Sequence, residues 1–161
     1  MNERYLKFLS KIKNNELIIH DGAIGTELQR RGVSMDGSWC GTASLQEEIL
    51  TQIHKDYIIA GSDIITTNTY ASSRIMLKAA GFEKRFKEIN LKAINSALNA
   101  REEINENDIL IAGSISHRYP IADGDTLSQA VVNVSKDELH DSTEEMLNLL
   151  SNNGCDLILL E

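Results

Sequence analysis

The sequence predicts an α/β fold built on a parallel sheet. Four short apolar runs, rich in β-branched residues, lie at residues 17–21, 63–69, 109–114 and 155–161. Segments with the apolar spacing of helices separate them, and such helices join parallel strands by right-handed crossovers. Each run ends in small or polar residues, at the end where parallel α/β folds bind ligands. We therefore expect polar side chains to gather along one rim of the sheet.

Helices are expected before and between these runs. A capping-box pattern, in which Ser or Thr precedes Glu or Gln by three residues, marks three helix starts. A glycine that follows the last periodic residue marks each matching helix end. These three helices start at Thr26, Ser44 and Ser135 and stop at Gly32, Gly61 and Gly154. Further helices are predicted over residues 3–14, 72–80 and 84–105.

A long polar loop is predicted over residues 117–134, with Asp123-Gly124-Asp125 near its middle. Loops of this length in compact domains are often functional, and disorder is the alternative interpretation. The sequence leaves both open.

Composition excludes several classes of partner and site. The 161 residues carry a net charge of −8 with no basic stripe, so we expect no nucleic-acid partner. No apolar run approaches the roughly 18 residues of a membrane span. Residues 1–16 are polar and charged, unlike a secretory signal, which favours a cytoplasmic location. Cys40 and Cys155 form no paired metal-binding pattern, and we expect free thiols.

Four segments together resemble one enzyme family. Residues 21–26, DGAIGT, closely resemble the D-G-(A/G)-x-G-T signature of the homocysteine S-methyltransferases, which include the S-methylmethionine and betaine enzymes and the homocysteine module of methionine synthase. Residues 60–70, 112–115 and 154–161 are similar to that family's later strands, in the same order. The resemblance implies a (β/α)8 TIM barrel. We expect residues 1–161 to be a single domain, its N-terminal half, supplying roughly the first four strands.

The resemblance also implies a chemistry. Methyl transfer to homocysteine needs a thiolate, and a free thiol with a pKa of about 8.5 is mostly protonated at neutral pH. Zinc binds and deprotonates the thiol in this family. Its three cysteine ligands come from later strands, so we expect no metal ligand within this chain and an inactive fragment. The partners implied are homocysteine and a small methyl donor. Residues 117–120 depart from the family's Gly-Pro pair, which leaves S-methylmethionine, betaine and methyl-folate open as donors.

Seven residues are candidates for the homocysteine site. Asp21 and Glu161 end the first and fourth runs. The resemblance implies that both hold the substrate, with Glu161 the better candidate for its ammonium group. The alternatives are that Asp21 caps the glycine loop and that Glu161 is a solvated carboxylate.

The other five candidates are smaller. Gly22 and Gly25 permit close backbone approach and unusual φ angles, and N–H groups near Thr26 suit a carboxylate. The alternative is a plain strand-to-helix turn. Thr67 and Asn68 offer donors and acceptors at the rim, or else hydrogen bonds that stiffen the strand ends.

The sequence also gives expectations for one aromatic, one imidazole and one thiol side chain. Trp39 is a candidate contact for a cationic methyl donor, or a packing anchor for its loop. We expect His20 to be packed and hydrogen-bonded, and Cys155 to be a small buried apolar residue.

Two functions from different classes follow. The first is a methyltransferase fragment, and the alternative is a non-catalytic half-barrel that binds a small molecule or acts as a scaffold. A phosphate-binding glycine loop is disfavoured because no Gly-x-Gly-x-x-Gly or Walker spacing occurs. In either case the unpaired sheet edges invite pairing with another chain, which predicts a homo-oligomer.

Overall fold

Three parallel strands form the sheet of this chain, in the order β1-β2-β3. The strands are β1 (Ile64–Thr66), β2 (Leu110–Ile115) and β3 (Leu157–Leu160). Every residue of β1 and β2 is buried, which explains why their sequences are continuous apolar runs rather than alternating ones. Ile65 pairs with Ile111, and Ser114 pairs with Leu159. The expected α/β class with a parallel sheet is therefore confirmed.

The computed structural model describes residues 3–35, 38, 40–116 and 134–161. Trp39 and residues 117–133 of the predicted loop lie outside this described part. Within it, β1 and β3 are the outer strands of an open sheet rather than parts of a closed barrel. Leu160 on β3 is 76% exposed. Pairing of this edge with a second chain stays a prediction.

The predicted first strand over residues 17–21 is reduced to a single bridge between His20 and Ile64. Two aspartates explain why the ladder stops on both sides. The N–H of Ile19 donates to the carboxylate of Asp63 at 2.8 Å, and the N–H of Thr66 donates to that of Asp21 at 2.7 Å. In a continued parallel ladder both N–H groups would donate to backbone carbonyls. The segment therefore follows β1 without being a strand.

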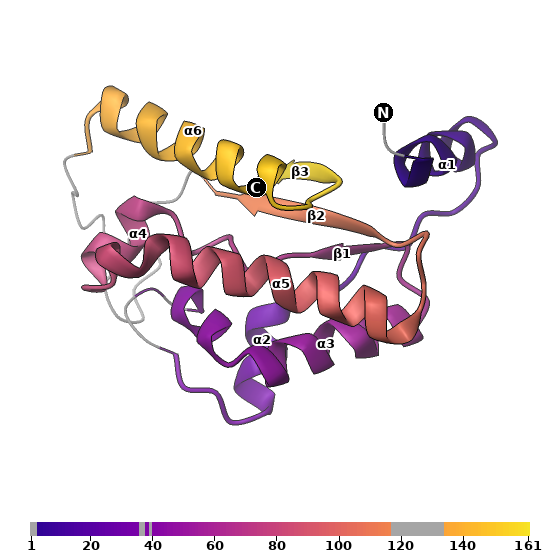
Figure 1. Ribbon diagram of the computed structural model, residues 1–161, viewed down its shortest axis with the longest axis horizontal. Coiled ribbons are helices and arrows are strands. Elements are labelled where there is room, and N and C mark those ends of the chain that lie inside the picture. Colours follow the sequence, from indigo (N-terminus) through magenta and orange to yellow (C-terminus); the bar gives the residue numbers. More distant parts are fainter. Residues whose placement is uncertain (1–2, 36–37, 39, 117–133) are drawn as a thin grey trace.

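Helices cover the sheet as the sequence predicts, with shifted ends. The main helices are α1 (Glu3–Lys13), α2 (Ile24–Arg30), α3 (Glu47–Ile59), α4 (Arg74–Ala79), α5 (Phe86–Ile104) and α6 (Lys136–Asn152). Short 3₁₀ turns lie at η1 (Gly41–Leu45) and η2 (Glu83–Arg85). Figure 1 shows α5 lying along α3, with α6 following β2 and β3. The predicted apolar stripe of α5 is confirmed, since its members from Phe86 to Ala100 are buried.

One of the three predicted capping boxes is confirmed. The Ser135 hydroxyl accepts from the N–H of Glu138 at 3.1 Å, and the Glu138 carboxylate accepts from the N–H of Ser135 at 2.9 Å. The predicted helix ends are also confirmed, because the glycines that follow α2, α3 and α6 have positive φ angles. These are Gly32, Gly61 and Gly154.

The other two capping boxes are wrong. Helix α2 starts at Ile24, so Thr26 lies inside its first turn and makes no cap. Helix α3 starts at Glu47 with Gln46 as its cap residue. Ser44 instead lies in η1, where its hydroxyl accepts a hydrogen bond from the Asn68 amide at 3.0 Å. A tertiary hydrogen bond has taken the side chain that the local pattern assigned to the helix.

Helix α1 lies at the amino-terminal end of the strands, apart from the other helices (Figure 1). None of its residues is buried, and Leu6 and Ile12 are about half exposed. Partly buried Phe8 packs against the core residues Ile64 and Leu110. Three ion pairs also hold the helix, each to an aspartate one or two residues before a strand. The pairs are Lys11–Asp63 at 2.6 Å, Lys7–Asp108 at 2.7 Å and Arg4–Asp156 at 3.2 Å. The rim opposite α1 is left open.

Candidate active site

A pocket of about 510 Å³ lies at the carboxyl ends of the strands. All seven residues that the sequence singles out for the substrate line it: Asp21, Gly22, Gly25, Thr26, Thr67, Asn68 and Glu161. Ser114, a polar strand-end residue expected on this rim, also lines the pocket, together with side chains that the sequence did not place there, among them His20, Cys40, Thr66 and Tyr70. The fold therefore brings the expected residues together, while their contact with a substrate stays a prediction.

Asp21 lies deep in this pocket. Its side chain is only 1% exposed, and Thr66 binds both of its carboxylate oxygens. The Thr66 N–H donates to Oδ2 at 2.7 Å, and the Thr66 hydroxyl donates to Oδ1 at 2.9 Å. These bonds tie the segment before α2 to the end of β1. Asp21 thus joins two elements instead of capping the glycine loop on its own.

Burial is the main influence on the charge of Asp21. It raises the pKa of this carboxyl above its usual value, and the charge of Glu161 raises the pKa further. The two hydrogen bonds from Thr66 and the neighbouring His20 lower the pKa and oppose that shift. Both acids line the same strand-end pocket, so they lie at the same end of the sheet, as expected from their strand-end positions.

Glu161 follows β3 and is the more exposed acid of the pocket. The hydroxyl of Ser114, a buried residue of β2, donates to Glu161 Oε1 at 2.7 Å. The Glu161 N–H donates to the carbonyl of Ile115 at 3.0 Å, which continues the strand pairing to the pocket edge. The side chain is therefore oriented by a neighbouring strand and is not an unconstrained surface carboxylate.

Thr67 and Asn68 are buried and mainly serve the strand ends. The Thr67 and Thr69 hydroxyls share a hydrogen bond of 2.8 Å. The Asn68 amide donates to the carbonyl of Cys40 at 2.8 Å and to the Ser44 hydroxyl at 3.0 Å. These contacts favour the stiffening role among the two alternatives, and they hold the η1 turn against the pocket wall.

The glycines of the motif have ordinary φ angles, so the expectation of unusual backbone conformations is wrong there. Gly22 is needed for space instead. A Cβ atom on it would lie 2.8 Å from the Tyr57 hydroxyl oxygen and 3.1 Å from the ring. Gly25 is less restricted, because its Cβ would meet Cys40 Sγ at an ordinary 3.5 Å. The close approach of Tyr57 at Gly22 brings helix α3 against the loop.

His20 is hydrogen-bonded, as expected, but its side chain is 46% exposed rather than packed. Its Nε2 lies 2.9 Å from the Thr66 hydroxyl oxygen, and its Nδ1 lies 3.5 Å from Asp21 Oδ1. The sequence predicts a packing role for His20 because it lies at the end of an apolar run, and does not predict that it lines the pocket. Its position next to Asp21 in the sequence was the available signal.

The described residues contain no group of three His, Cys, Asp or Glu side chains that could hold a metal ion. Cys40 is buried in the pocket wall. Cys155 lies at the other end of the sheet, before β3, packed against apolar side chains. This packing confirms the expected apolar role, although Cys155 is only partly buried. Burial raises the pKa of its thiol to about 12. These residues do not form a zinc site.

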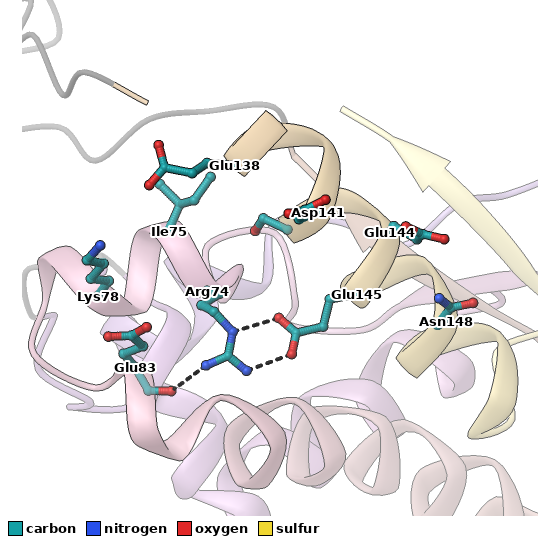
Figure 2. A pocket seen from close by; sticks show the side chains of 10 residues that line it. Arg74, Ile75, Lys78, Glu83, Glu138, Asp141, Glu144, Glu145 and Asn148 are labelled. Atoms are coloured by element: carbon teal, nitrogen blue, oxygen red, sulfur yellow. Dashed lines mark hydrogen bonds and ion pairs between the residues drawn. The ribbon is translucent and has the colours of Figure 1, made fainter. Parts of the chain in front are cut away.

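A second hollow of about 520 Å³ lies between α4 and α6, away from the strand ends. Figure 2 shows the Arg74 guanidinium filling its centre, bound by both oxygens of Glu145 at 2.7 and 2.6 Å. Arg74 also reaches the carbonyl of Glu83 at 3.4 Å and lies over the Phe86 ring. Ion pairing between helices accounts for this arrangement. The strand-end pocket is the better candidate site because it gathers the predicted residues.

No helix among the described residues is long and apolar enough to cross a membrane.

Comparison with known proteins points to one family. Residues 18–161 match the homocysteine S-methyltransferase family. Homocysteine S-methyltransferase YbgG of Bacillus subtilis (strain 168) is 31% identical over 157 residues, which cover 90% of this chain and 50% of that protein. Betaine–homocysteine S-methyltransferase 1 of Danio rerio is 32% identical over 111 residues, 67% of this chain and 27% of that protein.

Solved structures agree. The oxidized form of the homocysteine methyltransferase MmuM from Escherichia coli superposes with a TM-score of 0.77 at 26% identity. The match covers 98% of this chain and 56% of that one. The chain thus spans about half the length, or less, of these relatives. The family match, the curated relatives and the shared fold together show that this chain belongs to the homocysteine S-methyltransferase family.

Proposed function

We propose that this chain supplies half of the homocysteine pocket of a methyltransferase that converts homocysteine to methionine. The observation that carries the proposal is the presence of Asp21 and Glu161 in one strand-end pocket. Two carboxylates attract a primary ammonium, the group that every amino-acid substrate carries. The names of the relatives, which are homocysteine and betaine–homocysteine methyltransferases, support the same substrate class.

The two acids would divide the work. Asp21 is buried and already accepts two hydrogen bonds from Thr66, so it supplies mainly negative potential. Glu161 is exposed to the pocket and is the acid that a substrate ammonium can reach directly. N–H groups of the loop that leads into α2, near Gly25 and Thr26, remain the proposed contacts of the α-carboxylate. Trp39 remains a proposed contact of the methyl donor.

Replacing the exposed acid tests this assignment. Glu161→Gln keeps the size of the side chain but removes the charge that would pair with the ammonium. Because hydrogen bonds to charged groups contribute about 1.5–3 kcal/mol, we expect homocysteine to bind at least about tenfold more weakly. Chemical-shift titration of isotope-labelled protein with homocysteine measures the change.

A matched variant provides the control. Glu144 is an acid of α6 that lines the second hollow and not the strand-end pocket. Glu144→Gln should therefore bind homocysteine as the unaltered protein does. Equal affinities of Glu161→Gln and the unaltered protein would show that the ammonium is held elsewhere.

Zinc is the proposed cofactor of the whole enzyme. Since the described residues form no metal site, we expect this chain to retain well under one equivalent of zinc and to transfer no methyl group. A longer protein that includes the later, cysteine-bearing strands should bind about one equivalent. Elemental analysis after gel filtration distinguishes the two, and stoichiometric zinc on this chain alone would contradict the assignment.

The lack of a metal-binding group among the described residues also favours a second candidate function for this chain taken alone. A half-barrel that binds homocysteine without metal would act as a binding or scaffold module. Because this chain alone is expected to be inactive under both candidates, assay of the longer protein with homocysteine, zinc and each of the three donors separates them. Methionine formation excludes the non-catalytic function, and binding without turnover supports it.

A further inference from the structure

Each carboxylate of the pocket is held by a hydroxyl group from a neighbouring strand. Thr66, the last residue of β1, donates from its hydroxyl to Asp21 at 2.9 Å. Ser114, on β2, donates from its hydroxyl to Glu161 at 2.7 Å. Both hydroxyl-bearing residues are buried. A buried donor with one short bond to a carboxylate restricts the directions in which that carboxylate can point.

A second set of bonds fixes the two hydroxyl residues relative to each other. The Thr69 hydroxyl donates to the carbonyl of Ser114 at 2.7 Å and shares a 2.8 Å bond with the Thr67 hydroxyl. The Ser114 N–H reaches the Thr67 hydroxyl at 3.4 Å. The ends of β1 and β2 are therefore joined by side chains beyond their ladder. These bonds between the ends of β1 and β2 therefore help to set the distance between Asp21 and Glu161.

The Thr66 hydroxyl also contacts His20. A hydroxyl group has one hydrogen, and that of Thr66 is donated to Asp21. The Thr66 oxygen, 2.9 Å from His20 Nε2, must then accept from the imidazole. His20 therefore donates to Thr66, and Thr66 donates to Asp21, so the Asp21 carboxylate accepts this hydrogen bond. The ionised carboxylate, which only accepts hydrogen bonds, is the form that attracts a cation.

We propose that Thr66 and Ser114 are positioning residues for the α-ammonium group of the amino-acid substrate: Thr66 holds Asp21 as a source of negative potential, and Ser114 aims Glu161 as the direct partner. The inference rests on the proposed function, because it requires that this pocket binds a homocysteine-like amino acid. Neither residue needs to touch the substrate. Each acts through the carboxylate that it holds, so its effect should depend on the ammonium and not on the rest of the ligand.

Two ligands separate this role from simple structural support. Homocysteine carries the ammonium, and γ-mercaptobutyrate has the same thiol and carboxylate without it. The probe variants are Thr66→Val, which keeps the shape of the side chain, and Ser114→Ala. We expect each to weaken homocysteine binding about tenfold, the value of one hydrogen bond to a charged group, and to leave γ-mercaptobutyrate binding unchanged. Thr66→Ser keeps the hydroxyl and should restore homocysteine affinity.

Control variants remove similar hydroxyl groups elsewhere. Thr143→Val loses a bond to the carbonyl of Leu139, and Ser96→Ala loses a bond to that of Lys92. Neither residue lines the strand-end pocket, so both variants should bind homocysteine normally. Thermal melts of all variants show whether each is folded.

The outcomes distinguish the two claims. Normal homocysteine binding by Thr66→Val and Ser114→Ala overturns the inference and leaves the proposed function intact. Equal weakening for both ligands also overturns it, because the hydroxyls would then only support the fold. Failure of the unaltered protein to bind homocysteine overturns the proposed function and the inference together. Selective loss of homocysteine binding, restored in Thr66→Ser, supports both.

Discussion

Asp156→Ala should lower the free energy of unfolding by about 3–5 kcal/mol, the cost of breaking a buried ion pair from one side. The Asp156 side chain is only 2% exposed and accepts from Arg101 at 2.7 Å and from the N–H of Ile111 at 3.0 Å. It also pairs with Arg4 of α1. Removing the carboxylate leaves the largely buried Arg101 guanidinium without its counter-charge. Urea unfolding followed by circular dichroism measures the loss.

Asp108→Ala is the matched control for this prediction. Asp108 pairs at 2.7 Å with Lys7, which lies on α1 as Arg4 does, but both side chains are more than half exposed. Solvent screens such a pair, so the variant should unfold close to the unaltered protein. The Arg101–Asp156 and Lys7–Asp108 pairs are both 2.7 Å long, so the difference in burial accounts for the different effects that we expect. Equal losses in the two variants would show that contact with α1, and not burial, determines the stability.

His54 should make the protein less stable in acid. It lies on α3, fully buried, and neither ring nitrogen has a hydrogen-bond partner among the described residues. Burial lowers the pKa of His54 from 6.5 to about 4. As the pH falls below 6.5 the unfolded chain takes up a proton that the folded chain refuses until about pH 4. The stability from the neutral imidazole is therefore complete above pH 6.5 and lost toward pH 4, by about 3 kcal/mol.

Replacing the imidazole tests the sign and the pH window. His54→Leu should flatten the decline in unfolding free energy between pH 6.5 and pH 4, because it removes the group that protonates. Carboxylates contribute equally to both proteins, so the difference between the two curves isolates the histidine. His140 on α6 is exposed, and His140→Gln should leave the slope unchanged. Parallel curves for His54→Leu and the unaltered protein would contradict the prediction.

Local patterns in the sequence predicted most of the secondary structure, and with the family resemblance they predicted part of the pocket. Mostly apolar runs near glycine predicted β1, β2 and β3, because strands that are buried on both faces, as β1 and β2 are, consist mainly of apolar residues. The capping box at Ser135 formed as predicted, because both of its hydrogen bonds are local to the start of α6. Asp21 and Glu161 were assigned to one rim from their positions after apolar runs, and parallel topology brought them to one end.

Tertiary contacts decided what local patterns could not. The predicted first strand was shortened because the side chains of Asp21 and Asp63 take the backbone donors that a ladder would use. Ser44 left its predicted cap because Asn68, 24 residues away, binds it.

The partners of the two pocket acids are also a tertiary result. Thr66 is 45 residues from Asp21, and Ser114 is 47 residues from Glu161. Sequence spacing reports which residues lie on one element and where that element ends. It does not report the lateral register between elements, and that register determines which hydroxyl meets which carboxylate.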